Sequence, residues 1–333
     1  MKKHIYIYSP SGAVRDKAAF RRGVARLKTL GHEVEIDEAA LASHLRFAGD
    51  DETRLAAIHR AAASGADVAL VSRGGYGLTR ILGGIHYKAV AKAIEAGMLF
   101  VGISDFTAFQ NAVLARTGSV TWAGPALCEG FGVGGKADVA DGQDSGEKQL
   151  PDDIMEACFD DLIQGQGEGA GWRQNREAAR IASNSIASSA INTGPSAELS
   201  IKKAVIWGGN LTVLAALVGT PYFPDIKGGI LFLEDVAEHP YRIERMLTQL
   251  LHAGVLGRQK AIIMGQFTEF KLVPHDRGYK LQSVVDWLRQ QIKVPVLTNL
   301  PYGHVATKVI LPVGAKTDLL VEGRDALLFW GHS

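Results

Sequence analysis

The strongest constraint on the fold is a regular alternation of short apolar runs and amphipathic stretches in the first third of the chain. The apolar runs have the length and composition of buried strands, and the stretches between them have the periodicity of helices. Predicted strands cover 4–8, 32–36, 67–71 and 98–103, and predicted helices cover 16–30, 51–64, 86–96 and 105–117. Strands and helices that alternate in this way form a parallel, doubly wound sheet, whose working groups gather at the carboxyl ends of the strands.

The pattern is interrupted between about residues 130 and 200 and then returns. Residues 131–200 are rich in Gly, Asp, Ala and Ser, apart from one amphipathic stretch at 152–163, and they fit either a plain linker or a partly ordered lid. The later part again alternates, with strands predicted at 202–207, 229–233, 260–265, 294–298, 308–311 and 318–321 and helices at 211–218, 240–253 and 280–292. We therefore predict an N-terminal domain over 1–130, a linker or mobile insertion over 131–200, and a C-terminal α/β domain over 201–333.

Composition excludes several classes of protein. The 333 residues suffice for about two domains, and the formal net charge of +1 gives no overall field that would attract nucleic acid or an anionic membrane. The only cysteines, Cys128 and Cys158, have neither metal-ligand nor CxxC spacing. The basic start of the chain lacks the long apolar region of a signal peptide, and no apolar run is long enough to span a membrane. We expect a soluble cytoplasmic protein that has no metal site and no nucleic-acid or membrane partner.

Ser104 is the first candidate for chemistry, because it lies between a predicted strand and a predicted helix. A serine at a tight strand-to-helix turn has its hydroxyl lifted above the sheet, where backbone N–H groups at the start of the helix can stabilise an oxyanion. A serine that caps the helix would occupy the same place. The local pattern therefore leaves both interpretations open.

A serine nucleophile needs a base, and the base needs a carboxylate to orient it. His304 follows the turn-rich segment Asn-Leu-Pro-Tyr-Gly, from which a loop could present an imidazole. Glu234 ends the apolar run GILFL, with Asp235 and Glu238 as competing carboxylates. Taken singly, His304 could equally be a structural histidine and Glu234 a surface residue at the end of a strand.

A glycine-rich loop, Ser72-Arg73-Gly74-Gly75-Tyr76-Gly77, also leaves a predicted strand. Its glycines let the backbone approach a ligand or adopt positive φ. The loop could serve as a phosphate cradle or as part of an oxyanion hole. Its spacing matches neither a P-loop nor G-x-G-x-x-G, which disfavours a nucleotide site.

Taken together, five segments resemble the serine LD-carboxypeptidases, a family of murein tetrapeptide carboxypeptidases whose relatives include the microcin C self-immunity peptidases. The segments are SRGGYGLTRIL, VGISDFTAFQ, WGGNL, GTPYFPDIKGGILFLEDVAEHPYRIERML and LPYGH. The resemblance runs in order from about Ile5 to Gly314 and weakens across roughly 130–200. It implies a flavodoxin-like parallel-sheet N-terminal domain, a smaller C-terminal α/β domain, a site between them, a homodimer, and no metal or cofactor.

Carried over by motif, the resemblance implies a catalytic triad of Ser104, Glu234 and His304. It also implies an oxyanion hole formed by the backbone N–H groups of Gly75 and Asp105. These assignments come from the family motifs, because the spacing of the residues along the chain does not show that they meet.

The activity that the resemblance implies is hydrolysis of an amide through an acyl-enzyme, with removal of the terminal D-alanine from cytoplasmic murein tetrapeptide during peptidoglycan recycling. One alternative is an immunity-type peptidase that cleaves peptidyl or aminoacyl nucleotides. Another is a non-catalytic, two-lobed protein that binds a small molecule.

Three residues are candidates for substrate binding. Arg73 could hold the free carboxylate of the substrate, although a salt-bridged surface position fits it equally well. Trp207 and Asn210, in WGGNL, could line the cleft from the second domain, although a core position fits Trp207 at least as well.

Overall fold

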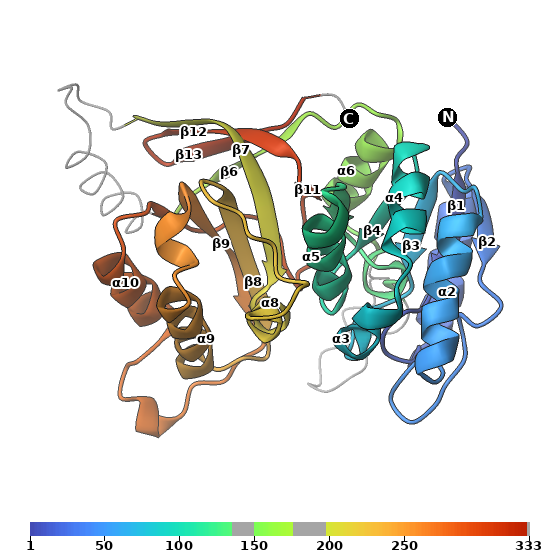
Figure 1. Ribbon diagram of the computed structural model, residues 1–333, viewed down its shortest axis with the longest axis horizontal. Helices are drawn as coiled ribbons and strands as arrows, with labels where there is room; N and C mark the ends of the chain where they lie inside the picture. The colour runs from blue at the N-terminus through green and yellow to red at the C-terminus, as the bar shows by residue number, and fades with distance from the viewer. Residues whose placement is uncertain (135–149, 176–197, 332–333) are drawn as a thin grey trace.

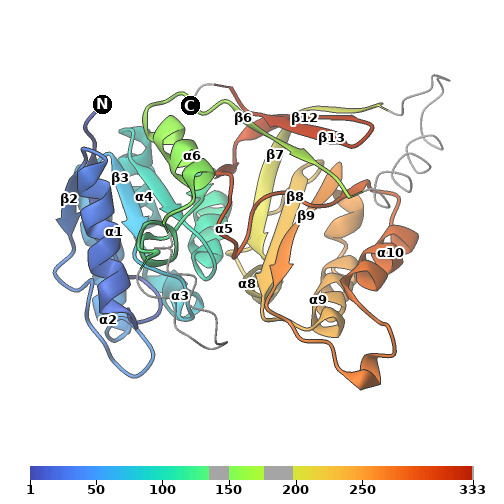
Figure 2. The same ribbon diagram turned by 180° about the vertical axis from the view of Figure 1, so that it is seen from behind.

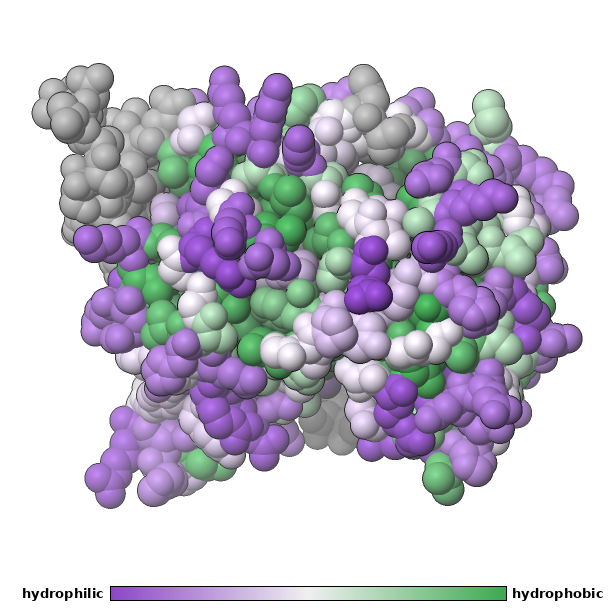
Figure 3. Space-filling view, viewed as in Figure 1, coloured by the Kyte–Doolittle hydropathy of each residue, from purple (hydrophilic) through white to green (hydrophobic). Residues whose placement is uncertain are grey.

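The computed structural model describes residues 1–134, 150–175 and 198–331, which form two α/β units side by side (Figure 1). The two units share one continuous hydrophobic cluster, which runs from the N-terminal sheet through α5 (Phe106–Thr117) into the C-terminal sheet. Within the described residues, none of the helices has the length and apolar character needed to cross a bilayer. Figure 3 shows hydrophilic residues spread over one face of the molecule, with smaller hydrophobic areas between them.

The N-terminal unit is the predicted parallel sheet. Its strand order is β11-β5-β4-β3-β1-β2, with β1 (His4–Tyr8), β2 (Glu33–Ile36), β3 (Val68–Val71), β4 (Leu99–Gly102) and β5 (Thr121–Ala123) parallel to one another. One face is covered by α1 (Lys17–Thr29) and α6 (Asp153–Ile163), which lie together in Figure 2. The other face is covered by α2 (Asp51–Ala63), α4 (Tyr87–Glu95) and α5, with the short α3 (Leu78–Ile81) beside them. This doubly wound arrangement confirms the predicted fold class.

The C-terminal unit is a seven-stranded mixed sheet of order β10-β9-β8-β7-β12-β13-β6. Its parallel half contains β7 (Glu198–Asn210), β8 (Ile230–Val236), β9 (Ala261–Thr268) and β10 (Val296–Leu297), with helices α8 (Leu211–Leu217), α9 (Pro240–His252) and α10 (Leu281–Gln291). Its antiparallel half contains β12 (Lys316–Glu322), β13 (Asp325–Phe329) and β6 (Gly169–Arg173).

Two segments of the chain join the units in ways that the sequence pattern did not predict. The late strand β11 (Leu311–Val313) pairs antiparallel with β5, so the C-terminal region completes the N-terminal sheet. From the predicted linker, α6 packs on the N-terminal sheet and β6 extends the C-terminal sheet. The amphipathic stretch noted at 152–163 corresponds to helix α6, whereas residues 135–149 and 176–197 of the predicted insertion lie outside the described residues.

Hydrogen bonds between buried groups hold the two units together directly behind the turn that carries Ser104. Asn111 Nδ2 on α5 donates to the carbonyl of Gly208 at 2.8 Å. The backbone N–H of Asn210 donates to Thr107 Oγ1 at 3.0 Å. Because α5 starts immediately after Ser104, these bonds fix the position of that turn relative to β7 and β8.

Candidate active site

Ser104 occupies a strained turn between β4 and α5. Its φ is 68°, in the left-handed region that costs a residue other than glycine roughly 1–2 kcal/mol. The N-cap position of α5 belongs to Asp105, and the Ser104 hydroxyl makes no hydrogen bond to any residue that the structure describes. The interpretation of Ser104 as a helix-capping serine is therefore wrong, and its hydroxyl is free to react.

The glycine-rich loop lies directly against Ser104. A Cβ atom built on Gly74 would lie 2.5 Å from Ser104 Cβ, so only glycine allows the loop to approach this closely. Gly75, whose φ is 125°, comes next and lines the cleft. Among the described residues, no group accepts a hydrogen bond from the backbone N–H of Gly75 or from that of Asp105. Both donors therefore remain available to an oxyanion beside Ser104.

The Asp105 side chain ties the glycine-rich loop to the serine turn. Its Oδ2 accepts a hydrogen bond from the backbone N–H of Leu78, just after the loop, at 2.9 Å. The carboxyl is buried, and this burial raises its pKa above the usual value. Asp105 thus offers its backbone N–H to the site while its side chain holds the loop in place.

The imidazole of His304 and the carboxylate of Glu234 form a hydrogen-bonded pair. Nδ1 of His304 lies 2.8 Å from Oε2 of Glu234, which is fully buried in the last part of β8. Asn210 Nδ2 donates to the other carboxylate oxygen of Glu234 at 3.1 Å and to Asp235 Oδ1 at 2.9 Å. With Nδ1–H donating to the carboxylate, Nε2 of His304 is left as the basic nitrogen.

The surroundings of this pair shift two pKa values. Burial alone would lower the pKa of His304, but the hydrogen bond to Glu234 and its negative charge outweigh that effect and raise the pKa above 6.5. Burial, assisted by the charge of Glu234, raises the pKa of Asp235 to about 6. The carboxylate that pairs with the histidine is therefore Glu234, while Asp235 receives hydrogen bonds from the N–H and hydroxyl of Thr212 at the start of α8.

Ser104 and His304 line the same cleft, which has a volume of about 750 Å³. This volume is in the range of small-molecule and peptide sites. The cleft also carries charges of both signs, from Arg15, Arg46, Arg73, Lys308, Glu129, Asp152 and Glu269. Across the described chain, no group of three or more His, Cys, Asp or Glu side chains is arranged to hold a metal ion.

Of the three predicted substrate-binding residues, only Arg73 lines the cleft. Trp207 is fully buried, with its indole N–H donating to Gln259 Oε1 at 3.1 Å, so the prediction that it lines the cleft is wrong and it is a core residue. Asn210 is also absent from the lining of the cleft. Its side-chain amide donates hydrogen bonds to the buried carboxylates of Glu234 and Asp235, so Asn210 positions Glu234 and does not face a ligand.

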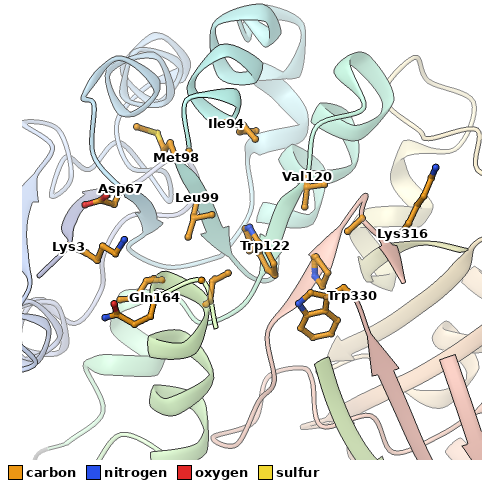
Figure 4. Close-up of a pocket in the computed structure, with 16 residues that line it drawn as sticks. Lys3, Asp67, Ile94, Met98, Leu99, Val120, Trp122, Gln164, Lys316 and Trp330 are labelled. Atoms are coloured by element: carbon orange, nitrogen blue, oxygen red, sulfur yellow. The ribbon is translucent and has the colours of Figure 1, made fainter. Parts of the chain in front are cut away.

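A second cavity, of about 590 Å³, lies at the amino ends of the parallel strands, away from the serine turn (Figure 4). Its walls include Leu99, Trp122 and Trp330, and none of the predicted catalytic residues lines it. The chemistry described above therefore belongs to the cleft at the carboxyl ends.

Comparison with known proteins gives the same interpretation for both halves of the chain. Residues 5–124 match the LD-carboxypeptidase N-terminal domain, and residues 203–319 match the LD-carboxypeptidase C-terminal domain. The crystal structure of muramoyltetrapeptide carboxypeptidase from Oxalobacter formigenes is 35% identical, with 98% of each chain covered and a TM-score of 0.78. The chain belongs to the LD-carboxypeptidase family.

Other members of the LD-carboxypeptidase family match over most of the chain. The murein tetrapeptide carboxypeptidase of Pseudomonas aeruginosa is 29% identical, with 90% of this chain and 87% of that protein covered. The microcin C7 self-immunity protein MccF of Escherichia coli is 25% identical over 76% of this chain and 70% of that protein. A structure of MccF with aspartyl sulfamoyl adenosine has a TM-score of 0.77 at 21% identity, with 99% of this chain and 96% of that chain covered, which shows the shared fold alone. The protein is thus a serine-type LD-carboxypeptidase, a hydrolase.

Sequence reasoning missed Lys308 and the roles of Gly74 and Asn210. Gly74 was recognised only as a member of the glycine-rich loop, although its contact with Ser104 requires a glycine there. The Asn210 side chain orients Glu234, and Lys308 lines the cleft in the same loop as His304. Proximity to the predicted triad in sequence was the one signal that could have singled out Lys308.

Proposed function

We propose that this LD-carboxypeptidase removes the terminal D-alanine from murein tetrapeptide in the cytoplasm, as a step of peptidoglycan recycling. The observation that carries the proposal is the convergence, in one cleft, of two groups: a serine hydroxyl in a strained turn, without a hydrogen-bond partner among the described residues, and a histidine paired with a buried glutamate. The names of the Oxalobacter and Pseudomonas relatives, which refer to muramoyl or murein tetrapeptides, support the choice of substrate.

Acylation begins when Nε2 of His304 takes the proton of the Ser104 hydroxyl. Ser104 Oγ attacks the carbonyl carbon of the amide, and the oxyanion that forms accepts hydrogen bonds from the N–H groups of Gly75 and Asp105. Loss of one such donor raises the barrier by about 3 kcal/mol in comparable enzymes. Glu234 stabilises the imidazolium through its bond to Nδ1.

Collapse of the tetrahedral intermediate releases the terminal residue. His304 gives its proton to the leaving nitrogen, the C–N bond breaks, and D-alanine departs with a neutral amine. The remaining peptide is held as an ester on Ser104. Water, deprotonated by His304, attacks this ester, and the proton returns to Ser104 Oγ as the acid product leaves.

A second candidate function is hydrolysis of an aminoacyl or peptidyl nucleotide. The similarity to MccF favours it, because the same fold binds aspartyl sulfamoyl adenosine in that protein. The same acyl-transfer chemistry would apply with a different leaving group. The non-catalytic alternative is not retained, since the chain is a member of a hydrolase family.

The test is to incubate the purified protein with murein tetrapeptide and to measure released D-alanine for wild type and Ser104→Ala. The proposal predicts release by wild type and a loss of roughly 10⁵-fold or more in the variant, the size of effect seen when a serine nucleophile is removed. Release that survives in Ser104→Ala would exclude the triad. If wild type hydrolyses an aminoacyl-nucleotide analogue instead, the second function replaces the first.

The proposal includes a homodimer, which the resemblance to the family implies. Sedimentation or light scattering of the purified protein measures the mass directly. A mass of twice the 35.7 kDa chain is expected, and a single-chain mass at working concentration contradicts it.

A further inference from the structure

Lys308 is a cation buried in the wall of the catalytic cleft. It follows His304 in the irregular segment before β11, and only 3% of its surface is exposed. The backbone N–H of Val309 donates to the carbonyl of Pro301 at 2.8 Å, which closes this segment into one loop. Because one closed loop carries both residues, Lys308 and His304 keep a fixed relation to each other.

No hydrogen bond or ion pair to the Lys308 ammonium group is found among the residues that the structure describes. Burying an unpaired ammonium group is costly, and the burial lowers the pKa of Lys308. A side chain of this kind in a cleft is typical of a group that receives its counter-charge from a ligand.

The carboxylates that act on Lys308 electrostatically each have another partner. Glu234 accepts hydrogen bonds from His304 and Asn210. Asp152 accepts from Thr307 Oγ1 at 2.6 Å and from the N–H of Met155 at 2.9 Å.

Glu129, the third of these carboxylates, faces Arg73 with an N–O distance of 3.6 Å. Arg73 also donates to the carbonyl of Ala13 at 3.3 Å. Arg73 therefore already has protein acceptors, whereas the N–H donors of Lys308 are left for a ligand.

The chemistry of the reaction puts a carboxylate near this ammonium group. His304 gives its proton to the leaving nitrogen, so the leaving residue must lie against the His304 loop. In a carboxypeptidase substrate, one carbon atom separates that nitrogen from the free terminal carboxylate. The carboxylate must therefore approach the loop that carries His304 and Lys308.

We propose that the ammonium group of Lys308 binds the free terminal carboxylate of the substrate and so restricts cleavage to the last amide bond of the peptide. This inference rests on the proposed function, and it assigns to Lys308 the role that the sequence suggested for Arg73. An ammonium–carboxylate pair in a largely desolvated cleft discriminates strongly against a neutral terminus.

The experiment compares murein tetrapeptide with the same peptide ending in D-alaninamide, which lacks the negative charge. We expect wild type to cleave the acid with a kcat/KM roughly 30- to 100-fold higher than the amide. In Lys308→Met, kcat/KM for the acid should fall by about that factor, while kcat/KM for the amide stays within about threefold, because the amide never used the charge. Retained cleavage of the amide also shows that the variant is folded with an intact catalytic centre.

Three further variants keep the test decisive. Lys308→Gln also removes the charge, so it should lose the same preference for the acid and can replace the Met variant if that variant does not fold. Lys308→Arg keeps the charge and should retain the preference. Lys316→Met, at an exposed lysine outside the cleft, should behave as wild type.

Each remaining outcome overturns the inference. An unchanged preference for the acid in the folded Lys308 variants excludes Lys308, and a preference abolished by Arg73→Met assigns the carboxylate to Arg73. Equal cleavage of both peptides by wild type excludes carboxylate recognition while leaving the proposed hydrolysis intact. Cleavage of neither peptide by wild type removes the proposed function and this inference together.

Discussion

The two halves of the candidate active site are built by different means. In the N-terminal unit, the backbone positions Ser104, through a strand-to-helix turn with φ of 68° and a glycine packed against the side chain. In the C-terminal unit, side chains position His304, through bonds that run from Asn210 to Glu234 and on to the imidazole. The position of Ser104 is therefore sensitive to added side-chain volume and to changes in backbone conformation. The position of His304 is instead sensitive to the loss of single hydrogen-bonding atoms.

The contrast also explains why the two units share a core. A strained turn and a hydrogen-bonded pair on separate sheets can act together only if the sheets do not move relative to each other. The bonds from Asn111 to Gly208 and from Asn210 to Thr107 join the sheets behind the serine turn. We infer that the junction at α5 is part of the catalytic architecture.

Among substitutions that change how the serine and the histidine are positioned, the largest effect is expected from Glu234→Gln, which removes the charge that stabilises the imidazolium but keeps the shape of the side chain. By comparison with the equivalent change in a Ser-His-Asp enzyme, kcat should fall about 10⁴-fold.

The same pair of residues sets the pH dependence. Since a protonated His304 cannot accept the serine proton, activity is lost as pH falls through the pKa of His304. The wild-type midpoint should lie above pH 6.5, and the midpoint of Glu234→Gln should move to lower pH. Profiles of kcat/KM against pH for wild type and Glu234→Gln measure the two midpoints.

A wild-type midpoint below pH 6.5, or a midpoint that does not move in Glu234→Gln, would contradict this account of the C-terminal half. Asp235→Asn is the matched control on the neighbouring carboxyl. It should lower kcat far less, because Asp235 makes no bond to His304 among the described residues.

The next largest effect is expected from Gly74→Ala, which tests the N-terminal half. The new Cβ would lie 2.5 Å from Ser104 Cβ, so the turn or the loop must shift. A displacement of about 1 Å at a reacting group can cost about 100-fold, and we expect a loss of that size in kcat/KM. Gly257→Ala, where the added Cβ meets nothing within 4 Å, should keep full activity. Full activity in Gly74→Ala would show that backbone contact does not position the serine.

Asn210→Ser should have a smaller effect. Asn210 Oδ1 caps α8 by accepting from the N–H of Val213 at 3.1 Å, and serine can take over this cap. Its shorter side chain cannot also reach Glu234, which loses a bond worth about 1.5 kcal/mol, so kcat should fall roughly tenfold with KM unchanged. Urea unfolding provides the control measurement. A lower unfolding midpoint with unchanged kcat would make Asn210 a structural residue only.

The smallest effect concerns the strain at Ser104. Ser104→Gly should be about 1 kcal/mol more stable than Ser104→Ala, because glycine adopts a φ of 68° without steric cost. The same pair of substitutions at Ser283, inside α10, should give the opposite sign. Urea denaturation of the four variants measures both differences. Equal stability of the two Ser104 variants would mean that the turn stores no strain.

Local pattern predicted the regular elements of the two units well. It predicted the parallel strands β1 to β4 and the helices α1, α2 and α4 between them, but it missed the short α3. It missed β5 and the pairing of β11 with it, since these three-residue strands are specified by tertiary contacts. It also missed β6 and β13.

The site was predictable only in part, for the same reason. The turn at Ser104 follows from the strand and helix on either side of it, but Trp207 and Asn210 occupy similar sequence contexts and have different surroundings. The burial of Lys308 and the contact of Gly74 with Ser104 depend on segments far apart in the chain. No local period encodes such contacts.

The central claim, that Ser104 and His304 work as one unit across the two sheets, is tested most directly by a double-mutant cycle. The measured quantity is kcat for D-alanine release from murein tetrapeptide by wild type, Ser104→Ala, His304→Ala and the double variant. The account predicts that the double variant is no slower than the slower single variant, because each change alone already disables the shared proton transfer. Losses that multiply in the double variant would show that the two residues act independently and would contradict the account.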